Sequence, residues 1–199
     1  MKQLPVLLIG FRFCLAPLIL FLAWKYGLHA SLAIIVLMYL GLGSDILDGI
    51  VARYAGNASA RLRRLDSQTD LVFWLSIGFA SWMLYPAPIR EHRGAIIVIF
   101  VMEALCYVIS ILRFGKETCT HAFLAKMWGL SMLAAFTALI GFGHAGIPFW
   151  TAIVLGFVSH LDRILITLIL PHWTHDIPSA YHAWLIRKGK PFRRFKLFN

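Results

Sequence analysis

The sequence predicts an all-α membrane protein with six transmembrane helices. The chain has 199 residues, 60% of them hydrophobic, and a mean hydropathy of +0.76. Only 14% of its residues are charged, against roughly a quarter in a typical soluble domain. Several apolar runs approach or exceed the ~18 to 20 residues that a helix needs to cross a bilayer. We therefore expect one membrane domain over residues 1–199, with no soluble core.

The predicted spans follow one another along the chain, separated by short polar or Gly/Pro-containing links. They cover residues 5–24, 30–47, 65–85, 94–112, 122–142 and 149–170. The first span follows MKQ without a small-residue cleavage site, so we expect it to be retained. The second span continues in helical register to residue 53, and residues 54–64 read as a loop or a helical turn.

Proline and glycine mark several of the remaining boundaries. The third span ends at the Pro86/Pro88 pair, and a turn with Gly143, Gly146 and Pro148 precedes the sixth. Residues 171–199 form an aromatic and basic tail without a span. Such a tail is typical of a segment that lies at an anionic lipid surface.

The basic residues predict the orientation of the spans. Although the net charge of +10 could suggest a nucleic-acid partner, the lysines and arginines gather at the ends of apolar runs. Most of them lie in the second loop, the fourth loop and the tail, and only Lys25, Arg90 and Arg93 lie on the opposite side. The positive-inside rule then places both termini in the cytoplasm.

Four of the nine acidic side chains occur between residues 44 and 71. Asp45 and Asp48 are three residues apart, and Asp66 and Asp70 are four apart, so each pair shares one face of a helix. The predicted topology puts both pairs at the cytoplasmic end of the membrane, on helices that follow each other. Carboxylates so close together repel unless a cation neutralises them. Hard oxygen ligands suit Mg²⁺ or Mn²⁺, and two such ions are a common device for displacement at phosphorus.

Small and basic residues continue the same stretch. Gly49 removes a side chain where a ligand could approach the helix, Ala52 is small, and Arg53 can pair with phosphate oxygens. Together these residues resemble the signature of the CDP-alcohol phosphatidyltransferase family, D-x2-D-G-x2-A-R-x8-G-x3-D-x3-D. Seven of its eight specified positions match, and Leu62 stands where the family has its second glycine. The six-span layout, with Arg12 and Pro17 in the first span, is also similar to that family.

The resemblance implies an enzyme that transfers a phosphatidyl group from a CDP-activated lipid to an alcohol and releases CMP. It implies that Asp45, Asp48 and Asp66 hold the metals, and that Asp70 shares metal binding or deprotonates the attacking hydroxyl. It also implies that the nucleotide and its diphosphate contact Gly49, Ala52 and Arg53, next to Asp48. Leucine at position 62 would crowd the nucleotide site but leave the metal site intact.

The acceptor is suggested by cations outside this stretch. Arg113, Lys116 and Lys126 flank the fourth loop, and Arg163 lies in the last span. Cationic groups beside the metal site favour an acceptor that itself carries phosphate. We therefore expect glycerol-3-phosphate, with inositol phosphate or serine as alternatives. The same cations could equally be topology signals alone.

A rival function from another class is a small divalent-cation transporter, because carboxylates within a membrane can line an ion path. The crowding of the ionisable groups on one side of the membrane argues against it. Asp162 and Arg163 could pair with each other or with Arg12, and the role of Glu103 stays open. Homodimers are usual in the resembled family, and small residues of the third span would permit close helix packing. These are Ser76, Gly78, Ala80 and Ser81.

Overall fold

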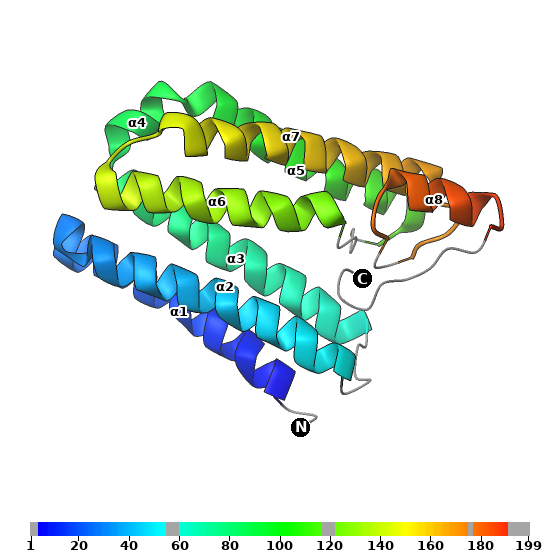
Figure 1. Cartoon of the computed structure of the whole chain (residues 1–199), viewed down its shortest axis with the longest axis horizontal. Coiled ribbons are helices and arrows are strands. Elements are labelled where there is room, and N and C mark those ends of the chain that lie inside the picture. Colours follow the sequence, from blue (N-terminus) through cyan, green and yellow to red (C-terminus); the bar gives the residue numbers. More distant parts are fainter. Residues whose placement is uncertain (1–3, 55–59, 117–121, 175–176, 191–199) are drawn as a thin grey trace. The chain divides into compact units, whose positions relative to one another are not determined.

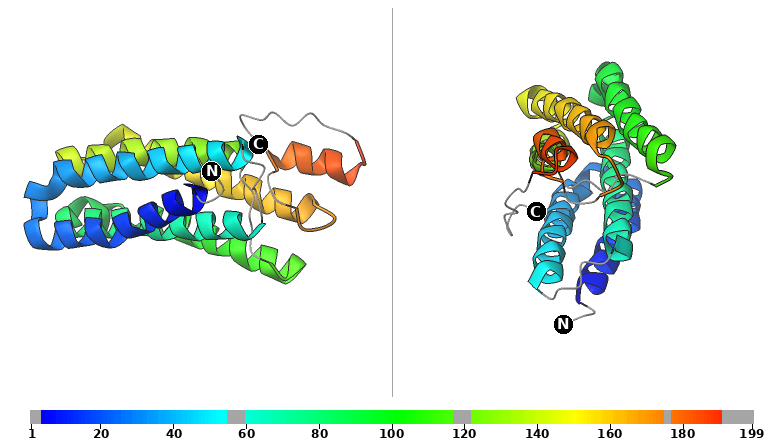
Figure 2. Two further views of the ribbon diagram at one scale, coloured as in Figure 1. Left: turned by 90° about the horizontal axis from the view of Figure 1, so that it is seen from below. Right: turned by 90° about the vertical axis from the view of Figure 1, so that its right-hand side faces the viewer.

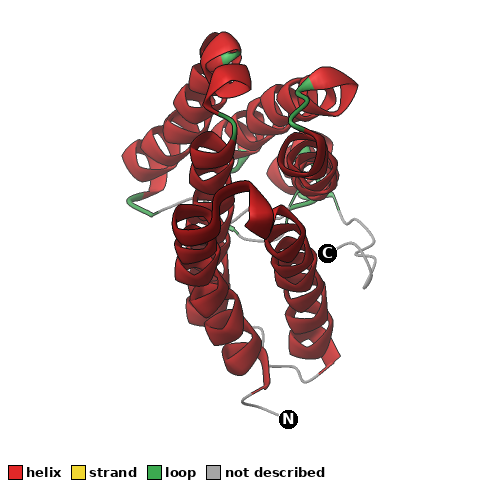
Figure 3. Cartoon of the chain, turned by 90° about the vertical axis from the view of Figure 1, so that its left-hand side faces the viewer, coloured by secondary structure: helices red, strands yellow, loops and turns green. Residues whose placement is uncertain are grey.

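The structure is a computed structural model of the chain that describes residues 4–54, 60–116, 122–174 and 177–190. Within these ranges, the side chains of residues 48, 49, 52–54, 60, 61 and 63 are outside the description. All regular structure in the described residues is helical, without strands (Figure 3). This confirms the all-α prediction.

The chain divides into two compact units. Unit 1 contains α1 (Leu4–Tyr26), η1 (Gly27–Ala30), α2 (Ser31–Tyr54), α3 (Ala60–Leu84), α4 (Pro86–Glu91) and the end of α6 (Phe123–Phe142). Unit 2 contains α5 (Arg93–Phe114), the start of α6, α7 (Gly146–Ile169) and α8 (Ala180–Arg187). The elements are labelled in Figure 1.

In unit 1, α1 and α2 form a hairpin, and α3 lies alongside α1. The chain reverses at η1, where Gly27 has a φ of +54°, a value that glycine adopts readily (Figure 2). Buried Ile19, Ile34 and Phe73 fill the space between the three helices. At Gly41 a Cβ atom would lie 2.1 Å from Cζ of Phe73, so only glycine allows this aromatic ring so close to α2.

In unit 2, α5 and α7 pack side by side and α8 docks at the end of α7 (Figure 1). A small apolar cluster fixes α8 there, consisting of Ala122, Ile166, Leu170, Ile177 and Ala183. The backbone N–H of Ala180, at the start of α8, donates to Oδ1 of Asp162 at 2.9 Å. The predicted tail thus begins with a short docked helix, and residues 191–199 lie outside the described part.

Four helical stretches of the described residues are long and apolar enough to cross a membrane. They are Leu4–Leu47, Arg93–Phe114, Phe123–Phe142 and Gly146–Ile169. The first contains α1 and most of α2, which fold back on each other, so it can account for two crossings. Helix α3 is not among the four, because the polar residues of its first half lower its hydropathy. A count of six crossings therefore depends on α3 and stays a prediction.

The helix boundaries agree with the predicted spans to within a few residues at most ends. The largest shift is in the third segment, because α3 begins at Ala60, five residues before the predicted start. The predicted polar link after the first span is η1, and the proline pair opens α4. Helix α7 begins at Gly146, inside the predicted turn.

Candidate functional site

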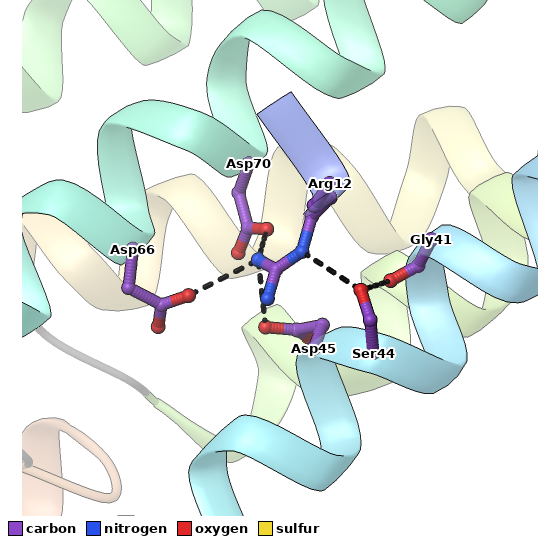
Figure 4. Close-up of polar contacts among 6 residues, drawn as sticks. All are labelled: Arg12, Gly41, Ser44, Asp45, Asp66 and Asp70. Carbon is purple, nitrogen blue, oxygen red and sulfur yellow. Dashed lines mark hydrogen bonds and ion pairs between the residues drawn. The ribbon is translucent and has the colours of Figure 1, made fainter. Parts of the chain in front are cut away.

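The central side chain of the site is Arg12, which comes from the middle of α1 and is fully buried. Its Nη1 atom lies 3.1 Å from Oδ1 of Asp45 and 3.0 Å from Oδ1 of Asp66, and it also contacts Oδ1 of Asp70. Figure 4 shows the guanidinium group surrounded by the three carboxylates. Helices α1, α2 and α3 therefore meet in one polar cluster. We call Asp45, Asp66 and Asp70 the triad, and Arg12 lies at its centre.

The helical spacing explains how the triad forms. Asp66 and Asp70 are one turn apart on α3, so both side chains reach the same side, and Asp45 reaches toward them from α2. One carboxylate oxygen from each of the three lies within 4.8 Å of the others. The predicted meeting of the two aspartate pairs is thus seen for three of the four residues. The side chain of Asp48 lies outside the described residues.

A hydrogen bond chain holds Arg12 from its other side. Its Nε atom donates to Oγ of Ser44 at 3.4 Å, and that hydroxyl donates to the carbonyl oxygen of Gly41 at 2.7 Å. Burial of an uncompensated guanidinium is costly, and burial of three uncompensated carboxylates is more so. Each charge type here offsets part of the desolvation cost of the other.

The donor set of the triad fits a divalent metal ion. Carboxylate oxygens are the ligands that Mg²⁺ and Mn²⁺ prefer, and the three side chains are 17% to 34% exposed, so an ion can reach them. The guanidinium of Arg12 marks the point at which positive charge is held. With one cation against three anions, two negative charges remain among these four side chains.

The residues predicted to bind nucleotide follow Asp45 on the same helix. Asp48, Gly49, Ala52 and Arg53 lie in the last turns of α2, but their side chains are outside the described part. Leu62 lies in the first turn of α3 and is half-buried.

The residues predicted to bind acceptor phosphate all belong to unit 2, where they also contact protein groups. Both Nη atoms of Arg163 donate to Glu103, at 2.7 Å and 3.3 Å. Arg113 donates to the carbonyl oxygen of Leu170 at 3.0 Å. The Nζ atom of Lys116 lies 5.0 Å from the centre of the Trp173 ring, and Lys126 is exposed on α6.

Glu103 also binds a residue that the sequence did not single out. The Nε2 atom of His160 lies 2.6 Å from Oε2 of Glu103, and Nδ1 bonds to the carbonyl oxygen of Gly156. The Trp128 ring packs edge-on against His160, with 4.7 Å between ring centres. We call Glu103, His160 and Arg163 the glutamate cluster. Its only sequence signal is the i, i+3 spacing of His160 and Arg163 on an apolar helix.

These contacts answer the questions left open by the sequence. Arg163 pairs with Glu103 on the neighbouring helix, and Arg12 pairs with the triad. Asp162 instead holds the start of α8 through Ala180. Ser44 and Arg12 are the members of the triad region that the sequence pattern alone did not connect to it.

The comparison with known families gives one match. The family model described as CDP-alcohol phosphatidyltransferase matches residues 2–158. The matched part includes Arg12, the whole triad and Glu103, whereas His160 and Arg163 follow its end. Comparisons with curated proteins and with solved structures give no match. Members of the family transfer a phosphatidyl group from a CDP-alcohol to an alcohol, and most depend on a divalent metal. The match covers most of the chain, and the chain therefore belongs to the CDP-alcohol phosphatidyltransferase family.

Proposed function

We propose that this protein transfers the phosphatidyl group of CDP-diacylglycerol to glycerol-3-phosphate, giving phosphatidylglycerophosphate and CMP. The observation that carries the proposal is the convergence of Asp45, Asp66 and Asp70 from α2 and α3. These are three of the seven family positions that the sequence matches. A family member with this carboxylate cluster retains the acidic groups that the reaction needs.

The roles of the site residues are proposed as follows. Asp45, Asp48, Asp66 and Asp70 would hold two Mg²⁺ or Mn²⁺ ions, which would supply positive charge to a diphosphate and to a departing CMP. The nucleotide contacts Asp48, Gly49, Ala52 and Arg53. Asp70 also accepts the proton of the acceptor hydroxyl. The oxygen of the acceptor hydroxyl then forms the new bond to phosphorus as the bond from phosphorus to CMP breaks.

A phosphorylated acceptor is proposed because the cations of unit 2 suit phosphate oxygens. Arg163, Arg113, Lys116 and Lys126 are the proposed acceptor-phosphate residues. At Arg163 an acceptor phosphate would compete with Glu103 for the same two nitrogen atoms. Inositol phosphate is the nearest alternative acceptor, and serine is a further one.

The proposed setting is the cytoplasmic membrane. We infer six crossings with both termini and the triad at the cytoplasmic side, within a single domain that forms homodimers. The positive-inside distribution of lysine and arginine supports this orientation. A membrane-impermeant label should reach tags at either terminus only in permeabilised cells. Labelling of a tag on intact cells would refute the orientation.

The test is CMP release by the purified protein with CDP-diacylglycerol, Mg²⁺ or Mn²⁺, and a panel of acceptors. We expect glycerol-3-phosphate to give the fastest release, inositol phosphate to be slower, and chelation of the metal to stop the reaction. Preference for serine or an uncharged alcohol would refute the acceptor. Absence of CMP with every acceptor would refute the enzyme and revive the cation-transporter alternative.

A further inference from the structure

The contact between Arg12 and the triad has an unusual geometry for an arginine. Three carboxylate oxygens, one each from Asp45, Asp66 and Asp70, converge on the single atom Nη1. That atom carries only two hydrogens. Convergence of three oxygens on one point is the arrangement by which carboxylates hold a metal ion, and here a fixed side-chain cation takes that point (Figure 4).

Among Arg12 and the three aspartates, the carboxylates outnumber the cation. Arg12 supplies one positive charge against three carboxylates, which leaves two negative charges among these four side chains. A divalent ion would cancel this excess. However, a guanidinium and a metal ion at contact distance repel each other strongly in a partly buried site. The same three oxygens therefore cannot hold both cations at once in this geometry.

We propose that Arg12 is the built-in counter-cation of the triad and that it competes with the divalent ion for the carboxylate oxygens. Without metal, Arg12 keeps the three carboxylates assembled. When metal binds, Nη1 of Arg12 moves away from the three carboxylate oxygens, while α1 stays in place. This inference rests on the proposed metal site. It makes Arg12 a positioning residue that lowers the affinity for metal and preserves the site in its absence.

The anchoring of Arg12 suits such a movement. The hydrogen bond from its Nε atom to Oγ of Ser44 is 3.4 Å, which is long for a hydrogen bond. The side chain is long and flexible, and the carboxylates remain fixed by α2 and α3. If Arg12 were instead a permanent structural partner, the metal would bind without disturbing it, and removing Arg12 would only weaken the site.

The first test is Mn²⁺ binding to purified protein in detergent micelles, followed by electron paramagnetic resonance in buffer without phosphate. We expect Arg12→Gln to lower the dissociation constant for Mn²⁺ at least about tenfold, because it removes a positive charge at contact distance. Arg12→Lys keeps the charge and should stay within about threefold of the wild type. Unchanged or weaker binding by Arg12→Gln would overturn the inference.

Thermal unfolding of the same variants gives a second readout. In the presence of a chelator, Arg12→Gln should unfold at a lower temperature than the wild type, because the three carboxylates lose the cation that contacts all of them. Saturating Mg²⁺ should then raise the Tm of this variant by about 3–6 °C more than that of the wild type, as expected for tenfold tighter binding. Equal increases would contradict the competition.

A third measurement is made on the wild-type protein, in which Arg12 is present. In wild-type protein with ¹⁵N-labelled arginine, the Arg12 side-chain signal is identified as the one missing from Arg12→Lys. Saturating Mg²⁺ should shift that signal and speed the exchange of its hydrogens with water. An unchanged Arg12 signal together with proven Mn²⁺ binding would overturn the inference and leave the proposed metal site standing. Absence of metal binding to the wild type would refute both.

Discussion

The two polar clusters of this protein have opposite compositions. In unit 1, one arginine faces three aspartates from α2 and α3. In unit 2, one glutamate on α5 faces a histidine and an arginine on α7. Both clusters lie on apolar helices, and both join segments more than 50 residues apart in the sequence.

This difference indicates what each cluster can bind. The triad has more carboxylates than Arg12 neutralises, and these are partly exposed, so it can accept a further cation. The glutamate cluster has an excess of basic groups, but His160 is fully buried and Glu103 serves both of its neighbours. Its Arg163 Nε atom is buried and has no hydrogen-bond partner among the described residues. We therefore expect the triad to determine the chemical step, and the glutamate cluster to determine stability and, through Arg163, binding of the acceptor phosphate.

The largest effect should come from a neutral residue at position 70. Asp70→Asn removes the proposed proton acceptor, so we expect CMP release to fall by about 10²- to 10⁴-fold. Its Tm should stay unchanged or rise, because one of three mutually repelling carboxylates is gone. The matched control is Asp162→Asn, which keeps an oxygen to accept the N–H of Ala180 and should retain activity. A large loss of stability in Asp70→Asn would break the comparison.

The opposite pattern is expected at Glu103. Glu103→Gln leaves Arg163 and His160 without their carboxylate, and loss of one partner from a buried ion pair costs about 3 kcal/mol or more. Thermal unfolding in micelles measures this loss. Inorganic phosphate should restore part of the Tm of Glu103→Gln, whereas Mg²⁺ should not. A loss below about 1 kcal/mol would show that the cluster contributes little.

A smaller effect should follow from filling the space beside His160. A Cβ atom at Gly156 would lie 2.6 Å from Nε1 of Trp128 and 3.0 Å from Cδ1 of Ile99. Gly156→Ala should therefore destabilise the protein by about 2 kcal/mol. Gly129 on α6 has no atom within 4 Å of the same position, so Gly129→Ala is the control and should be neutral or slightly stabilising. Equal effects of the two substitutions would contradict this packing.

The smallest effect is expected at Ser44. Ser44→Ala removes the acceptor for Nε of Arg12 and should cost about 1 kcal/mol. Ser81 is a matched control, because it is buried on α3 and donates to the carbonyl oxygen of Ile77 at 2.8 Å, as Ser44 does to Gly41. Thermal unfolding should show a smaller loss for Ser81→Ala. The difference between the two variants measures the contact with Arg12.

The triad was largely predictable because its geometry is local. The i, i+4 spacing fixes Asp66 and Asp70 on one face of α3 whatever the tertiary structure, and the short connection between α2 and α3 keeps Asp45 near them in the sequence. The position of Arg12 was not predictable in the same way. Helix α1 is apolar around most of its circumference, so its sequence does not determine which side turns toward α2 and α3.

The glutamate cluster depends entirely on which helices are neighbours. Glu103 and Arg163 are 60 residues apart in the sequence, and no local sequence pattern predicts that α5 and α7 pack together. For Asp162, by contrast, the sequence suggested a pairing with its neighbour Arg163 that the structure does not have. Adjacent residues on a helix point in directions about 100° apart, so Asp162 and Arg163 could not easily meet, and Asp162 reaches α8 instead.

The burial of Arg12 also has a consequence for how the protein is made. Arg12 leaves the ribosome first, whereas Asp66 and Asp70 follow 54 and 58 residues later. At about 5–20 residues per second, the guanidinium waits roughly 3 to 12 seconds for these two carboxylates. During that interval α1 carries a charge that lipid tolerates poorly. The α1–α2 hairpin brings Asp45 to Arg12 first, so we expect this one ion pair to carry the guanidinium through insertion until α3 is synthesised.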